Sequence, residues 1–104
     1  MEKYQQEMLR ARSRFTTLVS SLLLLAVDAA EMGYKELSSD MERLANEIIP
    51  IYMDFNDSFE MVVPEALEDL GLIESGKLLE VLRAMMDDGL IEQSGKGKYR
   101  VRGK

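Results

Sequence analysis

Apolar residues in the first third of the chain recur at alternating spacings of four and three, the pattern of a heptad helix. From Met1 to Arg14 only this narrow seam is apolar, whereas between Leu18 and Ala30 the apolar set is broader. Gly33 is typical of the residue that follows a last helical turn, so the sequence predicts one long helix ending there. The seam consists of Tyr4, Met8, Ala11, Phe15, Leu18, Leu22, Leu25, Ala29 and Met32.

A helix of about 30 residues is ~45 Å long, which exceeds what the rest of so small a domain is expected to cover. We therefore expect residues 1–37 to form a dimerisation helix. The alternative is a helix that folds back on its own domain, with its first turns frayed in solvent. The predicted homodimer interface consists of Tyr4, Met8, Ala11, Phe15, Leu18, Leu22 and Leu25.

Residues 38–104 are predicted to form a second unit that begins with a shorter helix. Ser39 and Glu42 have the spacing of an S-x-x-E capping box, which is typical of a helix start. Residues 41–49 place their apolar side chains on one helical face. Pro50 is expected to end or kink this helix, because proline lacks the backbone N–H that the helix needs.

The sequence between residues 50 and 76 predicts several short elements. Residues 56–58 are turn formers, and the apolar run at 59–63 indicates a short edge strand. Pro64 suits the first position of a helix, so we expect a short helix over 65–70 and a turn over 72–74.

A third helix and a β-hairpin are predicted to complete the chain. The third helix spans Gly76–Asp88 and is ended by Gly89. Leu90–Gln93 indicates a strand, residues 94–97 a glycine-rich turn, and Lys98–Arg102 the returning strand.

The stretch LLEVLRAMMDDGLIE, from Leu78 to Glu92, resembles the third helix and first wing strand of the winged helix-turn-helix superfamily. Members often show an L-x-x-L rhythm, then Gly-Leu-Ile, then a glycine-containing wing and an aromatic residue such as Tyr99. The resemblance covers about residues 38–104 and identifies no subfamily. The expected fold is therefore mainly α with a small β-hairpin: a winged helix-turn-helix domain preceded by a long heptad helix.

The resemblance implies a DNA-reading third helix and a wing that touches the DNA backbone, as in the DNA-binding members. On this helix Lys77 and Arg83 are the cations, and three acids leave it with a net charge of −1, which suits a polyanion poorly. Arg83 either contacts a guanine or forms an ion pair with Glu80 or Asp87 at helical spacing. Other members serve as protein-interaction modules, so the fold does not decide the function.

The charge distribution favours the wing as the nucleic-acid contact. The chain has 13 Lys+Arg against 19 Asp+Glu, for a net charge of −6, yet residues 94–104 contain no acid. In a strand, the cations there alternate with Tyr99 and Val101, which places them on one face. Such a row contacts phosphates without reading bases; alternatively, it protects an edge strand from aggregation. The predicted nucleic-acid-binding residues are Lys96, Lys98, Arg100 and Arg102, with Lys77 and Arg83 secondary.

The composition argues against catalysis. The chain has no cysteine and no histidine, which excludes disulfides, zinc–thiolate sites and thiol catalysis and removes the usual general base near neutral pH. No constellation of the remaining carboxylates, lysines, tyrosines or hydroxyls suggests an active site. We therefore expect neither an enzyme nor a cofactor.

One spacing resembles a calcium-binding loop. Asp54, Asn56, Ser58, Glu60 and Glu65 fall at its liganding positions. The sixth position, where the sharp turn needs glycine, is Phe59. We therefore interpret the segment as a solvated acidic loop and predict no metal site.

The apolar run from Phe15 to Val27 follows a basic stretch and resembles a secretory signal. However, Glu2 and Glu7 precede it, and it ends at Asp28, short of the ~20 residues that span a bilayer. We expect a cytoplasmic protein with no membrane contact. The predicted function is that of a small dimeric winged-helix protein that binds double-stranded DNA and regulates transcription. The alternative is a winged-helix interaction or scaffold module that binds a protein partner without specific DNA binding.

Overall fold

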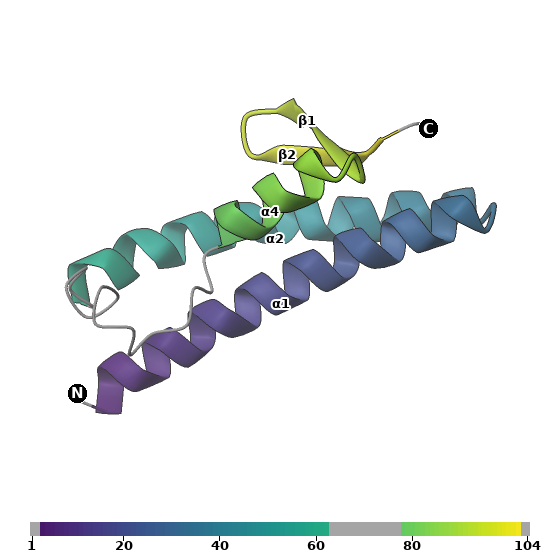
Figure 1. Ribbon diagram of the computed structural model, residues 1–104. Helices are drawn as coiled ribbons and strands as arrows, with labels where there is room; N and C mark the ends of the chain where they lie inside the picture. Colours follow the sequence, from purple (N-terminus) through teal and green to yellow (C-terminus); the bar gives the residue numbers. More distant parts are fainter. Residues whose placement is uncertain (1–2, 63–77, 103–104) are drawn as a thin grey trace.

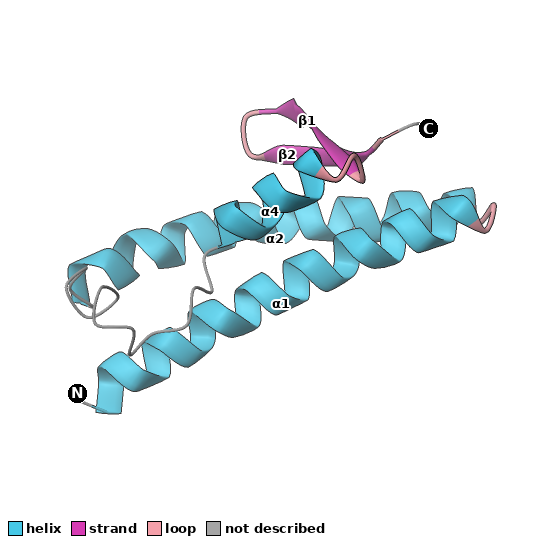
Figure 2. Ribbon diagram, in the orientation of Figure 1, coloured by secondary structure: helices cyan, strands magenta, loops and turns pink. Residues whose placement is uncertain are grey.

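The computed structural model describes residues 3–62 and 78–102. Within these residues the fold is mainly helical with one small antiparallel hairpin, as the sequence predicts (Figures 1 and 2). The elements are α1 (Lys3–Glu31), α2 (Lys35–Val62), α4 (Leu78–Asp87), β1 (Ile91–Gly95) and β2 (Lys98–Val101). The two long helices run antiparallel, and α4 and the β-hairpin pack against one side of them (Figure 1).

The turn between α1 and α2 is made by Gly33, as predicted. Its φ of 86° lies in the left-handed region, which glycine adopts without steric cost. The Gly33 N–H donates to the Ala30 carbonyl at 3.1 Å, and the Tyr34 N–H donates to the Ala29 carbonyl at 2.8 Å. These two bonds satisfy carbonyls that the end of α1 leaves without helical partners.

One face of helix α1 is covered along its length by its own chain, so the expectation that the domain is too short to reach along it is wrong. The reason is the length of α2, which has 28 residues and runs alongside α1 (Figure 1). The buried side chains of α1 form a stripe that is largely offset from the predicted seam. They are Met8, Arg12, Thr16, Val19, Leu23, Ala26, Val27, Ala29 and Ala30.

Helix α2 begins earlier than the capping box predicts. It starts at Lys35, so Ser39 and Glu42 lie inside it and do not cap its start. The buried Ser38 instead donates its hydroxyl hydrogen to the Ala26 carbonyl of α1 at 2.7 Å. The predicted boundary between residues 37 and 38 therefore falls within a helix that is bonded to α1.

Helix α2 also continues through Pro50 to Val62. This contradicts the predicted turn at 56–58, and it contradicts the predicted strand at 59–63 for the residues up to Val62. The buried residues Ala45, Ile49, Tyr52 and Phe59 recur at helical spacing on both sides of the proline. Burial of this stripe against α1 outweighs the cost of a proline and three turn-forming residues within the helix. The remaining predictions for residues 63–77 lie outside the described residues.

The main core includes side chains from every described element. Val19 and Leu23 of α1, Tyr52 of α2 and Leu82 of α4 meet there, and the Tyr52 hydroxyl accepts a hydrogen bond from the Leu78 N–H at 3.3 Å. A second cluster, Met8 with Phe59, joins the other ends of the long helices.

Helix α4 and the β-hairpin follow the order that the sequence predicts, although β1 continues to Gly95 into the predicted turn and the predicted helix start at Gly76 lies outside the described residues. Gly89, with a φ of 75°, ends the helix, and its N–H donates to the Met86 carbonyl at 3.0 Å. In the antiparallel pair Ile91 lies opposite Val101 and Gln93 opposite Tyr99, with an irregularity before Gly95.

By length and composition alone, α1 is apolar enough to cross a membrane. In the structure 39% of its most apolar window is buried within the chain, and core helices of water-soluble proteins meet the same criterion.

Candidate nucleic-acid interface

Strand β2 is anchored on α2 by side chains that bond to its backbone. The Asn46 Nδ2 donates to the Tyr99 carbonyl at 2.8 Å, and the Tyr99 N–H donates to the Asn46 Oδ1 at 2.9 Å. One helical turn earlier, a Glu42 carboxylate oxygen accepts the Val101 N–H at 3.1 Å. Tyr99 and Val101 also bury their side chains in the core. The strand is therefore held by both its backbone and its apolar face.

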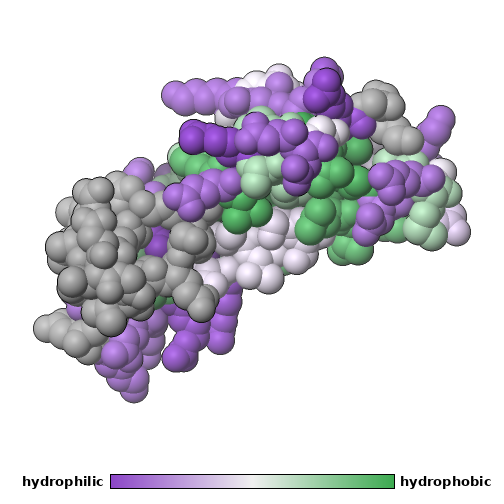
Figure 3. All heavy atoms as spheres, in the orientation of Figure 1, coloured by the Kyte–Doolittle hydropathy of each residue, from purple (hydrophilic) through white to green (hydrophobic). Residues whose placement is uncertain are grey.

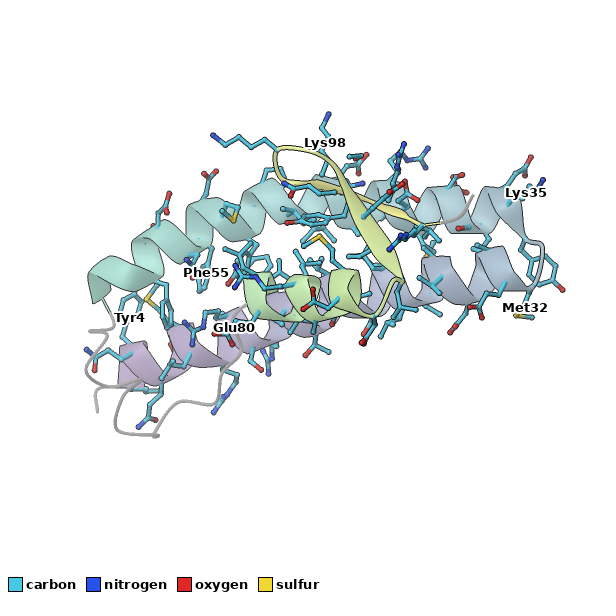
Figure 4. The ribbon with its side chains drawn as sticks, turned by 45° about the horizontal axis from the view of Figure 1, so that its top comes forward. Tyr4, Met32, Lys35, Phe55, Glu80 and Lys98 are labelled. Atoms are coloured by element: carbon cyan, nitrogen blue, oxygen red, sulfur yellow. The ribbon has the colours of Figure 1, made fainter. Side chains whose placement is uncertain are left out.

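The two cations of β2, Lys98 and Arg100, lie on the face opposite Tyr99 and Val101, which confirms the predicted alternation within this strand. Along β2 exposed and buried residues alternate strictly, and Lys98 extends outward from the molecule (Figure 4). Hydrophilic side chains gather over the hairpin in Figure 3, above hydrophobic surface that lies towards α1. The exposed cations are Lys96, Lys98, Arg100 and Arg102.

Arg100 differs from the neighbouring cations because a carboxylate partly neutralises its charge. Its Nε lies 2.6 Å from a carboxylate oxygen of Glu92, the residue opposite it in β1. Within residues 3–62 and 78–102, no carboxylate lies within 4 Å of the charged groups of Lys96, Lys98 or Arg102. These three cations are therefore more available to an external anion than Arg100 is.

The alternative role of the cations, protection of an edge strand, is weakened by the anchoring. The outward N–H and C=O groups of Tyr99 and the outward N–H of Val101 are already bonded to α2. A covered edge cannot pair with another strand, so it does not require lysine or arginine for protection.

Helix α4 offers a poor surface for DNA. It has one cation, Arg83, against Glu80 and Asp87. Arg83 is exposed and forms no ion pair with either acid, so the ion-pair interpretation is wrong. Leu79 on the same helix is 49% exposed. Lys77 lies outside the described residues.

The residues predicted to form the dimer interface fall into two groups. Met8 is buried against Phe59, Phe15 contacts the rings of Tyr52 and Phe55, and Leu22 packs on the main core. These three have partners within the chain. The exposed group is Tyr4, Leu18 and Leu25, with Ala11 half-buried.

The interpretation of this segment as a solvated acidic loop is wrong, because Asp54, Asn56, Ser58 and Glu60 lie within α2, where they form neither a solvated loop nor a calcium-binding loop. Glu65 lies outside the described residues. Among the residues that the structure describes, no three acidic side chains are grouped closely enough to hold a metal ion.

Asn46 and Glu42, which anchor β2, are positions that the sequence analysis did not single out. Asn46 stands between the apolar residues Ala45 and Ile48, and Glu42 follows Met41. Polar residues next to the buried stripe of an amphipathic helix are a signal for contacts with a neighbouring backbone.

Comparisons with protein-family models, with curated proteins and with solved structures give no match.

Proposed function

We propose that this protein is a small dimeric winged-helix regulator that binds duplex DNA mainly through the phosphate backbone. The observation that supports this most is the group of exposed cations along the anchored hairpin. Lys96, Lys98 and Arg102 have no carboxylate partner in the described part of the chain. At ~3.3 Å per residue, the cations of β2 stand about 6.6 Å apart, a spacing that suits successive phosphates.

The contact is expected to position the protein on DNA more than to read its sequence. Phosphate contacts supply most non-specific affinity and contain no direct sequence information. The described part of α4 offers Arg83 alone for a bidentate contact to guanine. Sequence preference is therefore expected at one base position per subunit, over a strong background affinity.

The test is a fluorescence-anisotropy salt titration with a random duplex and a duplex from upstream of the gene. The variant Lys96→Ala/Lys98→Ala removes two unpaired cations from the hairpin. Each lost phosphate contact should flatten the slope of log affinity against log salt by about 0.9. We expect a change of about two units per subunit, nearly equal on both duplexes.

The matched control is Lys3→Ala/Arg10→Ala, which removes the same charge from exposed positions at the far end of α1. This control should leave the slope almost unchanged, since exposed charges more than about 10 Å from the DNA are screened. Equal slopes for the hairpin variant and the unmodified protein would overturn the proposal.

A protein-interaction module is the second candidate, favoured by the acidic surface of α4 and its exposed Leu79. Absence of DNA binding at ~50 mM salt, where electrostatic contacts are strong, would support this candidate. Retained binding that depends on the hairpin would exclude a purely protein-directed role.

A further inference from the structure

The two long helices expose a regular row of large apolar side chains each. On α1 these are Leu18 and Leu25, with exposed fractions of 47% and 53%, and the row continues to Met32, 67% exposed, in the turn just after the helix. On α2 they are Leu37, Leu44 and Ile51, with exposed fractions of 49%, 39% and 58%. Within each row neighbours are seven residues apart, which places them on one helical face. We call these six residues the outer face.

The two rows lie on the same side of the α1–α2 pair. Phe15 and Phe55 are half-buried and meet at the seam between the helices, with ring centroids 5.3 Å apart. Leu18 lies one turn along α1 from Phe15, and Ile51 lies one turn along α2 from Phe55, each further from the buried stripe. The rows therefore flank one seam.

This side is opposite the β-hairpin. At about 100° per residue, Leu44 points about 160° away from Glu42 and about 160° away from Asn46, the residues that hold β2. A partner on the outer face would leave the hairpin cations free.

The pairs Met32 with Leu37, Leu25 with Leu44, and Leu18 with Ile51 are each centred in the sequence on the junction between Tyr34 and Lys35, where α2 begins. Because the rows flank one seam, a two-fold axis parallel to the helices and midway between them would face each row towards the other row of a second copy, offset along the helices by about two residues. Such a self-complementary patch is the requirement for an isologous dimer.

We propose that the outer face binds a second copy of this chain, with α1 of one copy lying over α2 of the other. This inference deepens the dimer of the proposed function by naming its surface and geometry. It replaces the buried members of the predicted seam, Met8, Phe15 and Leu22, with residues of α2.

The available area is sufficient for a stable dimer. The half-buried Ala11 and the exposed Tyr4 extend the α1 row towards its N-terminal end. The span from Tyr4 to Met32 is ~42 Å at the helical rise per residue. With a molecular width of 22 Å, the flat footprint is roughly 900 Å², against ~800 Å² per partner in a standard interface.

One pair of opposite charges at the margin of the outer face comes together in this arrangement. Arg14 lines a shallow depression on α1 together with Leu18, one turn before it. Asp54 lies one turn after Ile51 and is exposed. When Leu18 lies over Ile51 of the partner subunit, Arg14 lies at the height of Asp54 of the partner subunit. The pair occurs twice, once on each side of the axis.

The first test measures mass by light scattering and sedimentation equilibrium at high micromolar concentration. We expect twice the chain mass of 11.8 kDa for the unmodified protein. Leu25→Glu should give the monomer with unchanged helix content by circular dichroism, because this side chain is 53% exposed within one chain. Leu24→Glu is the matched control. Leu24 is 44% exposed but points away from the outer face, so this variant should stay dimeric.

A charge exchange tests the orientation. Arg14→Asp and Asp54→Arg should each weaken the dimer several-fold, and the double variant should restore it. A monomeric unmodified protein, or equal dissociation by Leu24→Glu, would overturn the proposed interface. Failure of the double variant to recover would overturn the placement of α1 over α2.

The outcome can be separated from that for DNA binding. The Leu25→Glu monomer retains every hairpin cation, so it should bind random duplex with about half the salt slope of the dimer. A monomeric unmodified protein whose DNA binding still depends on the hairpin cations would refute this inference alone. Loss of hairpin-dependent binding with the dimer intact would refute the DNA-binding proposal alone.

Discussion

Asn46 of α2 forms two hydrogen bonds with the backbone of Tyr99 in β2, one as donor at 2.8 Å and one as acceptor at 2.9 Å. A single amide side chain thus takes the place of a neighbouring strand along this part of the hairpin edge. The residues are separated by 53 positions in the sequence, so the contact joins a helix to the hairpin that bears the cations. The position of the proposed DNA-contacting surface depends on this pair.

We expect Asn46→Ala to destabilise the protein by about 1–3 kcal/mol, because it leaves a partly buried N–H and C=O without their partner. Asn46→Asp is the informative comparison: it keeps the acceptor for the Tyr99 N–H but loses the donor to the carbonyl. Urea denaturation followed by circular dichroism measures both. If Asn46→Ala changed the free energy of unfolding by less than about 0.5 kcal/mol, the anchoring role would be wrong.

Local signals in the sequence located several boundaries correctly. Gly33 and Gly89 end their helices because each needs a left-handed φ, a requirement that depends only on nearby residues. The alternation around Tyr99 and Val101 likewise placed the cations on the outward face, since a strand has a period of two.

The errors arose where tertiary packing outweighs local preference. Ser39 and Glu42 match a helix start, yet the Glu42 carboxylate binds the Val101 backbone from inside α2. Pro50 matches a helix end, yet Ile49 and Tyr52 bury one continuous stripe on either side of it. The capping and proline rules consider only hydrogen bonds between residues close in sequence. Burial against α1 joins residues that are distant in sequence, so these rules do not include it.

Replacing Pro50 tests the continuity of α2 directly. Pro50 is exposed and lies inside the helix, where proline costs up to ~3 kcal/mol relative to alanine. Pro50→Ala should therefore stabilise the protein by about 1–3 kcal/mol, visible as a higher melting temperature. Pro50→Gly should stabilise the protein by about 1 kcal/mol less than Pro50→Ala does, because glycine is a poor helix former. If the helix ended at residue 50, Pro50→Ala would not raise the melting temperature.

Phe59 tests the packing of the far ends of the two long helices. Its side chain is 2% exposed, contacts Met8, and lies beneath the Arg12 guanidinium at 4.2 Å from the ring centroid. Phe59→Ala should cost about 3–5 kcal/mol in the free energy of unfolding, the usual range for a buried phenylalanine. Met53→Ala, at a position that is 41% exposed on the same helix, should change it by no more than about 0.5 kcal/mol. Equal effects of the two variants would contradict the burial of Phe59 against α1.

Glu92 provides a test of the proposed function that gains binding instead of losing it. Its carboxylate holds the Arg100 Nε at 2.6 Å and so competes with any phosphate for that guanidinium. Both side chains are well exposed, at 41% and 58%, so the pair contributes little to stability and can be removed without unfolding the hairpin. Glu92→Gln should therefore release Arg100 and steepen the salt slope of DNA binding by up to about 0.9 per subunit.

The control for Glu92→Gln is Glu80→Gln, which makes the same charge change at an exposed position of α4. A general reduction in negative charge would strengthen DNA binding by both variants alike, with little effect on the slope. A specific release of Arg100 steepens the slope for Glu92→Gln alone, and Arg100→Ala in the same background should abolish the gain. If Glu80→Gln matched Glu92→Gln in slope, Arg100 would not be a phosphate contact, and the hairpin contribution would be limited to Lys96, Lys98 and Arg102.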